Sequence, residues 1–238
     1  MRNFNKGWPD RIISQVSTFD RGKSSHTVGV FDLSGGAMRE VKRIADLNTG
    51  ADAGDPAAGA RAYSESLRTF ANPARDHVWS AQLARYRLVR YGIDGTVQDS
   101  IIRRPSWFRD LEPMRLGSES SLPSPRLTGI AEDAQGRLWV FLAQPRPDAS
   151  KAWREAKVRM EKTPGGAQEG RVSDMPAEYK QFRTIIEVID PKTRRVIARS
   201  TVDGHVSYVI SSDRVVTFVE NEDGVPMATI WELALRGT

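Results

Sequence analysis

Short apolar segments separated by tight polar turns recur along this chain, and their period predicts β-strands. In ARYRL, residues 84–88, arginines alternate with Tyr86 and Leu88, which gives a strand one packed face and one solvated face. The segment LWVFL, residues 138–142, is apolar at every position, as expected for an inner strand packed on both faces. The pattern therefore indicates both surface strands and inner strands.

The residues between these segments have the composition of tight hairpin turns. Asp190 and Pro191 suit the first two positions of a type I turn, where proline holds φ near about −65°. Gly95, Gly136 and Gly224 follow aspartate or another polar residue and can adopt the positive φ of tight hairpins. We therefore expect antiparallel hairpins rather than junctions with helices.

The order of strand and turn repeats, which predicts four similar units. Segments that begin at Thr27, Tyr86 and Thr184 align with one another, and the segment from Met227 matches only their first strand. The first unit lacks a clear first strand, and the last unit lacks a fourth. We expect units at approximately 1–47, 66–103, 127–203 and 205–235, within a single domain of residues 1–238.

The predicted fold class is all-β: a β-propeller or partial propeller of four-stranded antiparallel blades, with one helical insertion. A two-sheet sandwich is the alternative, but its Greek-key crossings would not repeat the same strand and turn order. The helical insertion is expected within 145–182. Asp148 can cap a helix there, and Trp153, Ala156 and Met160 follow at intervals of three and four residues.

The segment TGIAEDAQGRLWVFL, residues 128–142, resembles the repeat of bacterial six-bladed β-propeller proteins of the NHL and two-component-regulator types. VFDLSG and VIDPKT are similar to the third-strand ends of those blades. Such families close with six blades, whereas this chain carries about four units. Because those families are often exported, the resemblance implies an extracytoplasmic protein, periplasmic or secreted, although residues 1–10 do not have the pattern of a signal peptide.

Loop lengths predict where a ligand would bind. In an antiparallel meander, connections from strand 1 to 2 and from 3 to 4 emerge at one end, and the other connections emerge at the opposite end. The first set is short, whereas the second set includes 48–65, 104–126 and 145–182. Loops longer than about 12 to 15 residues are usually functional or disordered. We therefore expect a binding face at this end, and the alternative is surface loops without a ligand.

Two aromatic groups in these connections are candidate binding residues. Trp107 and Phe108, flanked by Arg104 and Arg109, could stack on a flat ligand or anchor an interface. The alternative is that they fill the gap between two sheets. Trp153 could engage a partner from the predicted helix, or it could pack against the sheets.

Composition and charge exclude several partners and chemistries. The chain has 35 Lys and Arg against 30 Asp and Glu, and its long connections hold no basic cluster, so no nucleic-acid partner is expected. No run approaches the roughly 18 apolar residues of a membrane span, so no membrane insertion is expected. The absence of cysteine excludes disulfides and thiolate catalysis.

The sequence contains no recognisable catalytic constellation. His26, His77 and His205 lie far apart and form no spaced pair of metal ligands, so we expect surface or turn histidines. Glu187 is expected to be a charge on a strand face. We therefore predict no catalytic residue, no metal site and no cofactor.

These observations favour a non-catalytic binding or scaffold domain whose ligand is a protein or peptide on the face with the long loops. One alternative is a metal-dependent hydrolase or lactonase with its site in the propeller channel, as in propeller lactonases, although no residues here match their ligands. A third interpretation is the sensory domain of a membrane receptor, which rests on the regulator-like segment IAEDAQGRLWV.

Overall fold

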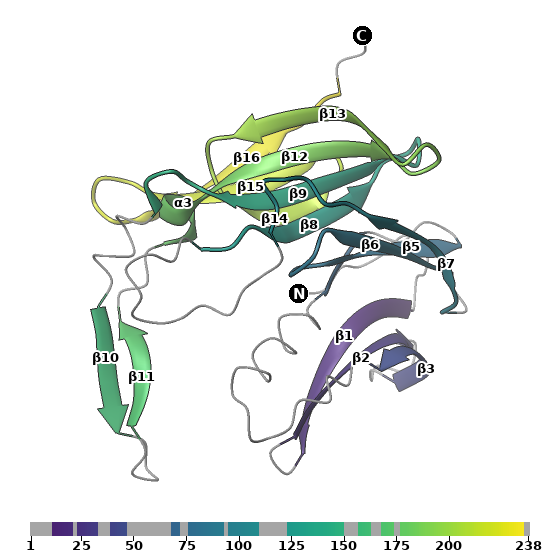
Figure 1. The fold of residues 1–238 in the computed structure, drawn as a ribbon, viewed down its shortest axis with the longest axis horizontal. Coiled ribbons are helices and arrows are strands. Elements are labelled where there is room, and N and C mark those ends of the chain that lie inside the picture. The colour runs from purple at the N-terminus through teal and green to yellow at the C-terminus, as the bar shows by residue number, and fades with distance from the viewer. Residues whose placement is uncertain are drawn as a thin grey trace.

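The computed structural model places sixteen strands and one short helix among the residues that it describes. These residues are 11–20, 23–32, 39–46, 68–71, 76–92, 95–109, 123–149, 157–162, 168–173 and 177–235. The strands form antiparallel sheets that follow one another along the chain, from purple at the N-terminus to yellow near the C-terminus in Figure 1.

The first two sheets are meanders of consecutive strands. Sheet 1 consists of β1 (Arg11–Asp20), β2 (Lys23–Asp32) and β3 (Arg39–Asp46). Sheet 2 consists of β4 (Arg68–Phe70), β5 (His77–Gln82), β6 (Arg87–Gly92) and β7 (Val97–Ile102).

The next two sheets continue the same pattern, with a hairpin inserted into the first of them. Sheet 3 consists of β8 (Arg126–Glu132), β9 (Leu138–Pro145), β12 (Phe182–Asp190) and β13 (Arg195–Val202). Between β9 and β12 lie a two-stranded hairpin, β10 (Lys157–Lys162) and β11 (Gln168–Ser173), and the helix α3 (Glu178–Gln181). Sheet 4 consists of β14 (Val206–Ser211), β15 (Arg214–Glu220) and β16 (Pro226–Glu232).

The first strands of neighbouring sheets contact one another. β8 of sheet 3 contacts β4 of sheet 2 on one side and β14 of sheet 4 on the other, and β1 contacts β4. Successive meanders joined along their first strands make a partial propeller. The predicted all-β fold class is therefore confirmed, while the single domain of residues 1–238 and the predicted limits of its units stay predictions.

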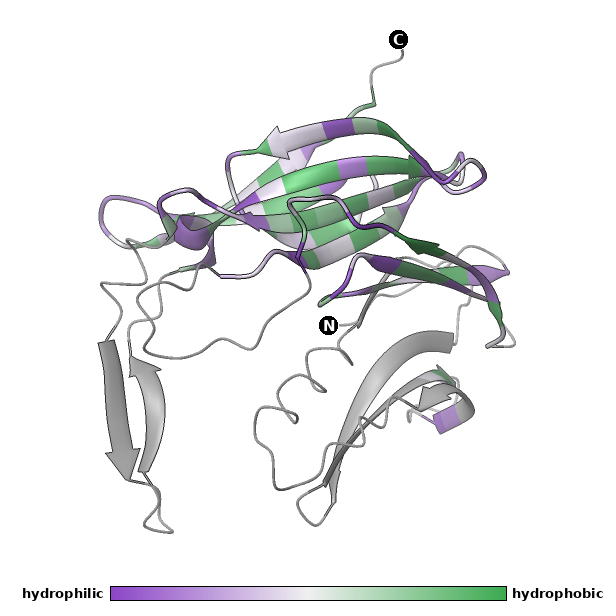
Figure 2. Cartoon of the chain, in the orientation of Figure 1, coloured by the Kyte–Doolittle hydropathy of each residue, from purple (hydrophilic) through white to green (hydrophobic). Residues whose placement is uncertain are grey.

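β9 shows why one segment is apolar at every position. Leu138, Val140 and Leu142 belong to the hydrophobic cluster shared with sheet 2, whereas Trp139 and Phe141 belong to the cluster shared with sheet 4. Successive side chains of a strand point to opposite faces, so β9 is packed on both. Figure 2 shows the resulting hydrophobic character along β9 and its neighbour β12. The prediction of an inner strand is confirmed.

Close packing of β8 on β14 depends on Gly129. A Cβ atom at this position would lie 2.3 Å from Val209 Cγ2, well inside van der Waals contact. Glycine has no Cβ, and it therefore lets sheets 3 and 4 approach where any other residue would push them apart.

The predicted hairpin turns are present, and one of them has an unpredicted conformation. Gly95, Gly136 and Gly224 have φ of 81°, 75° and 75°. Arg194, in the turn between β12 and β13, also has a positive φ of 57°. This conformation is uncommon outside glycine, asparagine and aspartate, so the residue type gave no indication of it.

The predicted helix within 145–182 is only partly correct. The described residues of the insertion include the four-residue helix α3, and Ala149, directly after the predicted cap Asp148, is also helical. The prediction of a helix that reaches Met160 is wrong, because this residue lies in β10 and pairs with Gly170 of β11. In KVRMEK, apolar and charged residues alternate with the period of a strand, and that signal overrides the helical spacing. Trp153 and Ala156 lie outside the described residues.

Candidate functional site

One end of the stacked sheets, which we call the short-turn end, brings together the short connections. Arg194, in the turn after β12, donates from Nη2 to Asp99 Oδ1 of sheet 2 at 2.8 Å. His77 at the start of β5 lies near Glu132 at the end of β8, with Nε2 2.9 Å from Oε2. The turns between first and second strands and between third and fourth strands therefore lie at the same end.

The opposite end, which we call the long-connection end, brings together the long connections. Arg126 at the start of β8 pairs with Glu178 of α3. Arg146 after β9 donates from Nη1 to Asp203 Oδ1, between sheets 3 and 4, at 2.7 Å. The described parts of the connections 104–126 and 145–182 thus meet at one end, as predicted, while the connection 48–65 lies outside the described residues.

A buried histidine lies at the centre of the long-connection end. His205 is 3% exposed, and its Nδ1 lies 3.3 Å from Glu178 Oε2 and 3.4 Å from Ser207 Oγ. Its ring packs against Phe182, with ring centroids 5.9 Å apart. Its Nε2 has no hydrogen-bond partner in the part of the chain that the structure describes. This atom is therefore a buried polar group without compensation.

Arg126 completes this cluster, which we call the His205 cluster: Arg126, Glu178, Phe182 and His205. The guanidinium of Arg126 lies 4.7 Å from the centre of the Phe182 ring. Burial lowers the pKa of His205, the Glu178 carboxylate opposes this shift, and the Arg126 charge adds to it. The imidazole is therefore neutral near pH 7, where it can accept or donate one hydrogen bond at Nε2.

The helix α3 connects this cluster to sheet 4. The Tyr179 hydroxyl donates to Glu220 Oε2 at 3.0 Å, and Lys180 Nζ lies 3.8 Å from the same carboxylate. Contacts of α3 with β12 and β15 accompany these bonds. The long connection of sheet 3 is thereby anchored on both of the last two sheets.

The predicted aromatic pair lies against the core between sheets 2 and 3. Phe108 is 7% exposed and packs on Tyr86, with ring centroids 5.6 Å apart. Trp107 is half-buried, and the guanidinium of Arg199 lies 5.0 Å from the centre of its ring. These contacts are those of the alternative interpretation, in which the pair fills the gap between two sheets.

The other predicted site residues have different surroundings. Arg104 and Arg109 are exposed on either side of the aromatic pair. Trp153 lies outside the described residues. A ligand-binding role for Arg104, Trp107, Phe108, Arg109 and Trp153 stays a prediction.

Glu187 occupies a place that the sequence did not indicate. It is 2% exposed, accepts a hydrogen bond from the Tyr86 hydroxyl at 2.5 Å and pairs with Arg103 of the chain segment after β7. Arg199 Nε lies 3.8 Å from its other oxygen. Burial and the Glu187 carboxylate raise the pKa of Tyr86, so its hydroxyl remains a donor. Glu187 lies on a face of β12, as expected, but sheet 2 covers this face, so the charge is buried.

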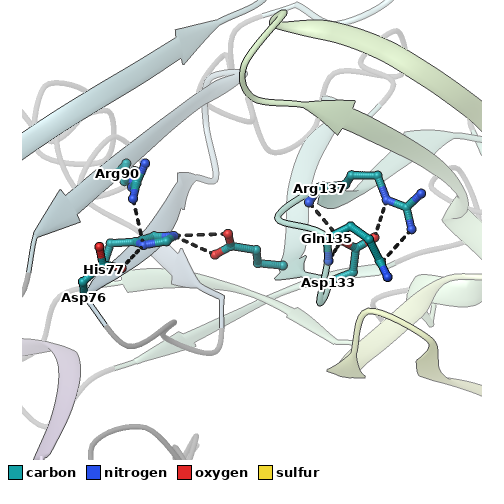
Figure 3. A network of polar contacts seen from close by, with 7 residues as sticks. Asp76, His77, Arg90, Asp133, Gln135 and Arg137 are labelled. Carbon is teal, nitrogen blue, oxygen red and sulfur yellow. Dashed lines mark hydrogen bonds and ion pairs between the residues drawn. The ribbon is translucent and has the colours of Figure 1, made fainter.

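A second buried histidine lies at the short-turn end. His77 is surrounded by Asp76, Arg90 and Glu132, with Asp76 Oδ1 2.7 Å and Arg90 Nη2 3.0 Å from Nδ1 (Figure 3). The hydrogen bond with His77 lowers the pKa of Asp76, and burial raises the pKa of Glu132 although His77 opposes that shift. Both ring nitrogens have protein partners, which indicates a structural contact between sheets 2 and 3.

The segment AEDAQGRLW, residues 131–139, forms the turn between β8 and β9 beside this histidine. Asp133 Oδ1 accepts from the backbone N–H groups of Gln135 and Arg137 at 3.0 and 2.9 Å. Its Oδ2 accepts from Arg137 Nε at 2.7 Å and from Trp139 Nε1 at 3.0 Å. Figure 3 shows Gln135 and Arg137 beside the carboxylate. Burial opposes the effect of these bonds, yet they hold the pKa of Asp133 below its usual value. The segment therefore stabilises the turn between β8 and β9.

No protein-family model and no curated protein matches this chain. Among solved structures, it is similar to an acylaminoacyl peptidase of Pyrococcus horikoshii in an orthorhombic crystal form. The TM-score is 0.43 and the sequences are 11% identical over 94% of this chain and 29% of the peptidase chain. The chain thus spans less than a third of the length of that protein. The specific resemblance to NHL-type six-bladed propellers stays a prediction.

Sequence reasoning missed the two buried histidines. His77 and His205 were expected at the surface or in turns. Both are buried, and only His205 lies in a connection, the one between β13 and β14; the side chain of His26 lies outside the described residues. One carboxylate partner of each histidine comes from a distant part of the chain: Glu132 lies 55 residues from His77, and Glu178 belongs to α3, which precedes β12 and β13, whereas His205 follows them. Only the packing of one sheet on the next brings them together.

Among the described residues, no group of three or more His, Cys, Asp or Glu side chains is placed to hold a metal ion. No helix in that same part of the chain is long and apolar enough to cross a membrane.

Proposed function

We propose that this chain is a non-catalytic binding or scaffold domain that takes a protein or peptide ligand at the long-connection end. The observation that carries the proposal is that the described parts of the connections 104–126 and 145–182 come together there, joined by the pair of Arg126 and Glu178 in the His205 cluster. Connections held on a rigid scaffold are the usual location of binding residues.

The charges of this end favour a ligand with mixed polarity. Arg126 pairs with Glu178, Arg146 with Asp203, and Lys180 with Glu220. Paired charges of both signs produce no strong field that would attract a polyanion. A peptide offers donors and acceptors along its backbone, and it can use the exposed partners of such pairs.

Arg104 and Arg109 supply exposed donors to this proposed surface, and the half-buried Trp107 lies between them in sequence. An indole that is held by Arg199 and by the core below loses little entropy when a ligand covers its remaining surface. Trp107 would therefore act as a rigid anchor, with the two arginines as polar contacts around it.

The test is selection of a displayed random peptide library on the immobilised chain, followed by titration of the enriched peptides. The double variant Arg104→Ala/Arg109→Ala is expected to weaken peptide binding by about tenfold or more. The matched control is Lys192→Ala/Arg195→Ala, which removes two exposed positive charges at the short-turn end. Failure to enrich any peptide, or equal weakening by both double variants, would contradict the proposal.

A further inference from the structure

Sheet 4 has two chemically distinct faces, and the inner one packs on sheet 3. Val215 and Thr217 of β15 are buried, and Val209 of β14 lies opposite Val215. Val206, Val209 and Val215 belong to, or pack against, the hydrophobic cluster that sheet 3 shares. The alternate residues of these strands must therefore point away from sheet 3.

The alternate residues form an apolar surface that we call the outer face of sheet 4. It consists of Tyr208, Val216, Phe218, Ala228 and Ile230. Strand register places Tyr208, Val216 and Ile230 in one row across the three strands, with Phe218 beside Ala228. The Tyr208 and Phe218 rings pack edge to face with centroids 5.8 Å apart.

Three large side chains of this surface are exposed to solvent. Ile230 is 64% exposed, and Tyr208 and Phe218 are also exposed. They are three of the eleven exposed large hydrophobic side chains in the described part of the chain, and they lie together on one face of one sheet. Exposed hydrophobic side chains that occur singly are normal, but a contiguous group of this kind marks an interaction surface.

The outer face continues a series of contacts already present in the chain. Sheet 2 packs on sheet 3 through one apolar cluster, and sheet 3 packs on sheet 4 through the next. The face of sheet 3 that covers sheet 4 carries Trp139, Phe141 and Ile186, a mixture of aromatic and β-branched residues like that of the outer face. The surface that complements the outer face is therefore the apolar face of another sheet.

The charges at the ends of the outer face allow it to meet a copy of itself. At one end Arg214 Nη2 lies 3.2 Å from Glu232 Oε1, and at the other end Lys180 lies 3.8 Å from Glu220. Each end thus carries a pair of opposite charges rather than a surplus of one sign. In a twofold interface the same patch appears on both sides, so an unbalanced charge would repel its own copy.

We propose that this chain forms a twofold dimer in which the outer faces of sheet 4 from two copies pack on one another. The occupant of the face is a second copy of the chain, and the interface has an apolar centre with the charge pairs at its ends. The Lys180–Glu220 end of this interface belongs to the long-connection end, but its apolar centre shares no residue with the proposed peptide surface around Trp107, so the dimer does not require the proposed function.

Sedimentation velocity of the full chain across a wide concentration range tests the dimer. At high concentration the wild-type protein is expected to sediment as a species with twice the 26.5 kDa mass of one chain. Ile230→Lys places a charge in the apolar centre, and it is expected to weaken dimerisation by about tenfold or more. Ala228→Lys, on the same strand, is expected to act in the same direction.

Ile102→Lys is the matched control. Ile102 is 61% exposed on the edge strand β7 of sheet 2, so the substitution and the exposure are nearly the same as at Ile230. This variant is expected to dimerise like the wild type, and circular dichroism checks that all variants fold. A wild-type chain that is monomeric at every concentration overturns the proposal, and so does equal weakening by Ile102→Lys and Ile230→Lys. In the monomeric case the face is covered by another protein or by a further sheet.

Discussion

The Tyr86 hydroxyl of sheet 2 donates a 2.5 Å hydrogen bond to the Glu187 carboxylate of sheet 3, and so connects two units of the chain through a buried anion. Arg103 supplies the opposite charge to the same oxygen. A buried carboxylate with these partners is stable only while the two sheets stay packed together.

Removal of the Glu187 carboxylate therefore tests the contact between sheets 2 and 3. Glu187→Ala is expected to lower the free energy of unfolding by about 3 kcal/mol, because it leaves the partly buried Arg103 without its partner. Urea unfolding measures the loss. Glu222→Ala, which removes an exposed glutamate in the turn before β16, is the control and is expected to change stability by less than about 0.5 kcal/mol. Similar losses in both variants would contradict a structural role for the buried pair.

Gly129 tests the contact between sheets 3 and 4. Gly129→Ala is expected to lower the free energy of unfolding by about 1 to 3 kcal/mol, because the new methyl group would overlap Val209. Gly204→Ala is the control, since a Cβ atom there would have its nearest neighbour, Thr217 Cγ2, at 3.6 Å. The double variant Gly129→Ala/Val209→Ala is expected to show less than the sum of the two single losses. Strict additivity would show that the two residues do not compete for the same space.

Phe108 tests whether the aromatic pair belongs to the core. Phe108→Ala is expected to lower the free energy of unfolding by about 3 kcal/mol, because it leaves a cavity beside Tyr86. Arg109→Ala, at the exposed neighbouring position, is expected to stay within about 0.5 kcal/mol of the wild type. Both are measured by urea unfolding, and a Phe108→Ala variant as stable as the wild type would contradict the packing described above.

His205 predicts a pH dependence of stability. Its pKa in the folded chain is below the usual 6.5, so the unfolded chain binds more protons as the pH falls past that value. The contribution of the neutral His205 to the free energy of unfolding is therefore fully present above about pH 6.5, and it is lost as the pH falls through the pKa of the folded chain. Urea midpoints at pH values on both sides of 6.5 measure the effect. His205→Gln, which cannot titrate, is expected to reduce the slope, and an unchanged slope would assign the dependence to other groups.

Local patterns were sufficient to predict the inner strand β9 and the tight turns of the sheets, but not the hairpin of β10 and β11. LWVFL indicated an inner strand, Asp190-Pro191 and the glycines at 95, 136 and 224 indicated hairpin turns, and the repeated order of strand and turn indicated successive meanders. These signals act between neighbouring residues, so they can be recognised along the chain. The helix up to Met160 failed because its spacing fitted two periods, and pairing with β11 decided between them.

The sequence alone determined the all-β class, the hairpins and the lengths of the connections, because these depend on residues that are close along the chain. Only the tertiary structure decided that Glu187 is buried, that His205 meets Glu178, and that the outer face of sheet 4 is left exposed. Each of these depends on how one sheet packs against the next, and residues from different units acquire their burial and their charge partners only through that packing.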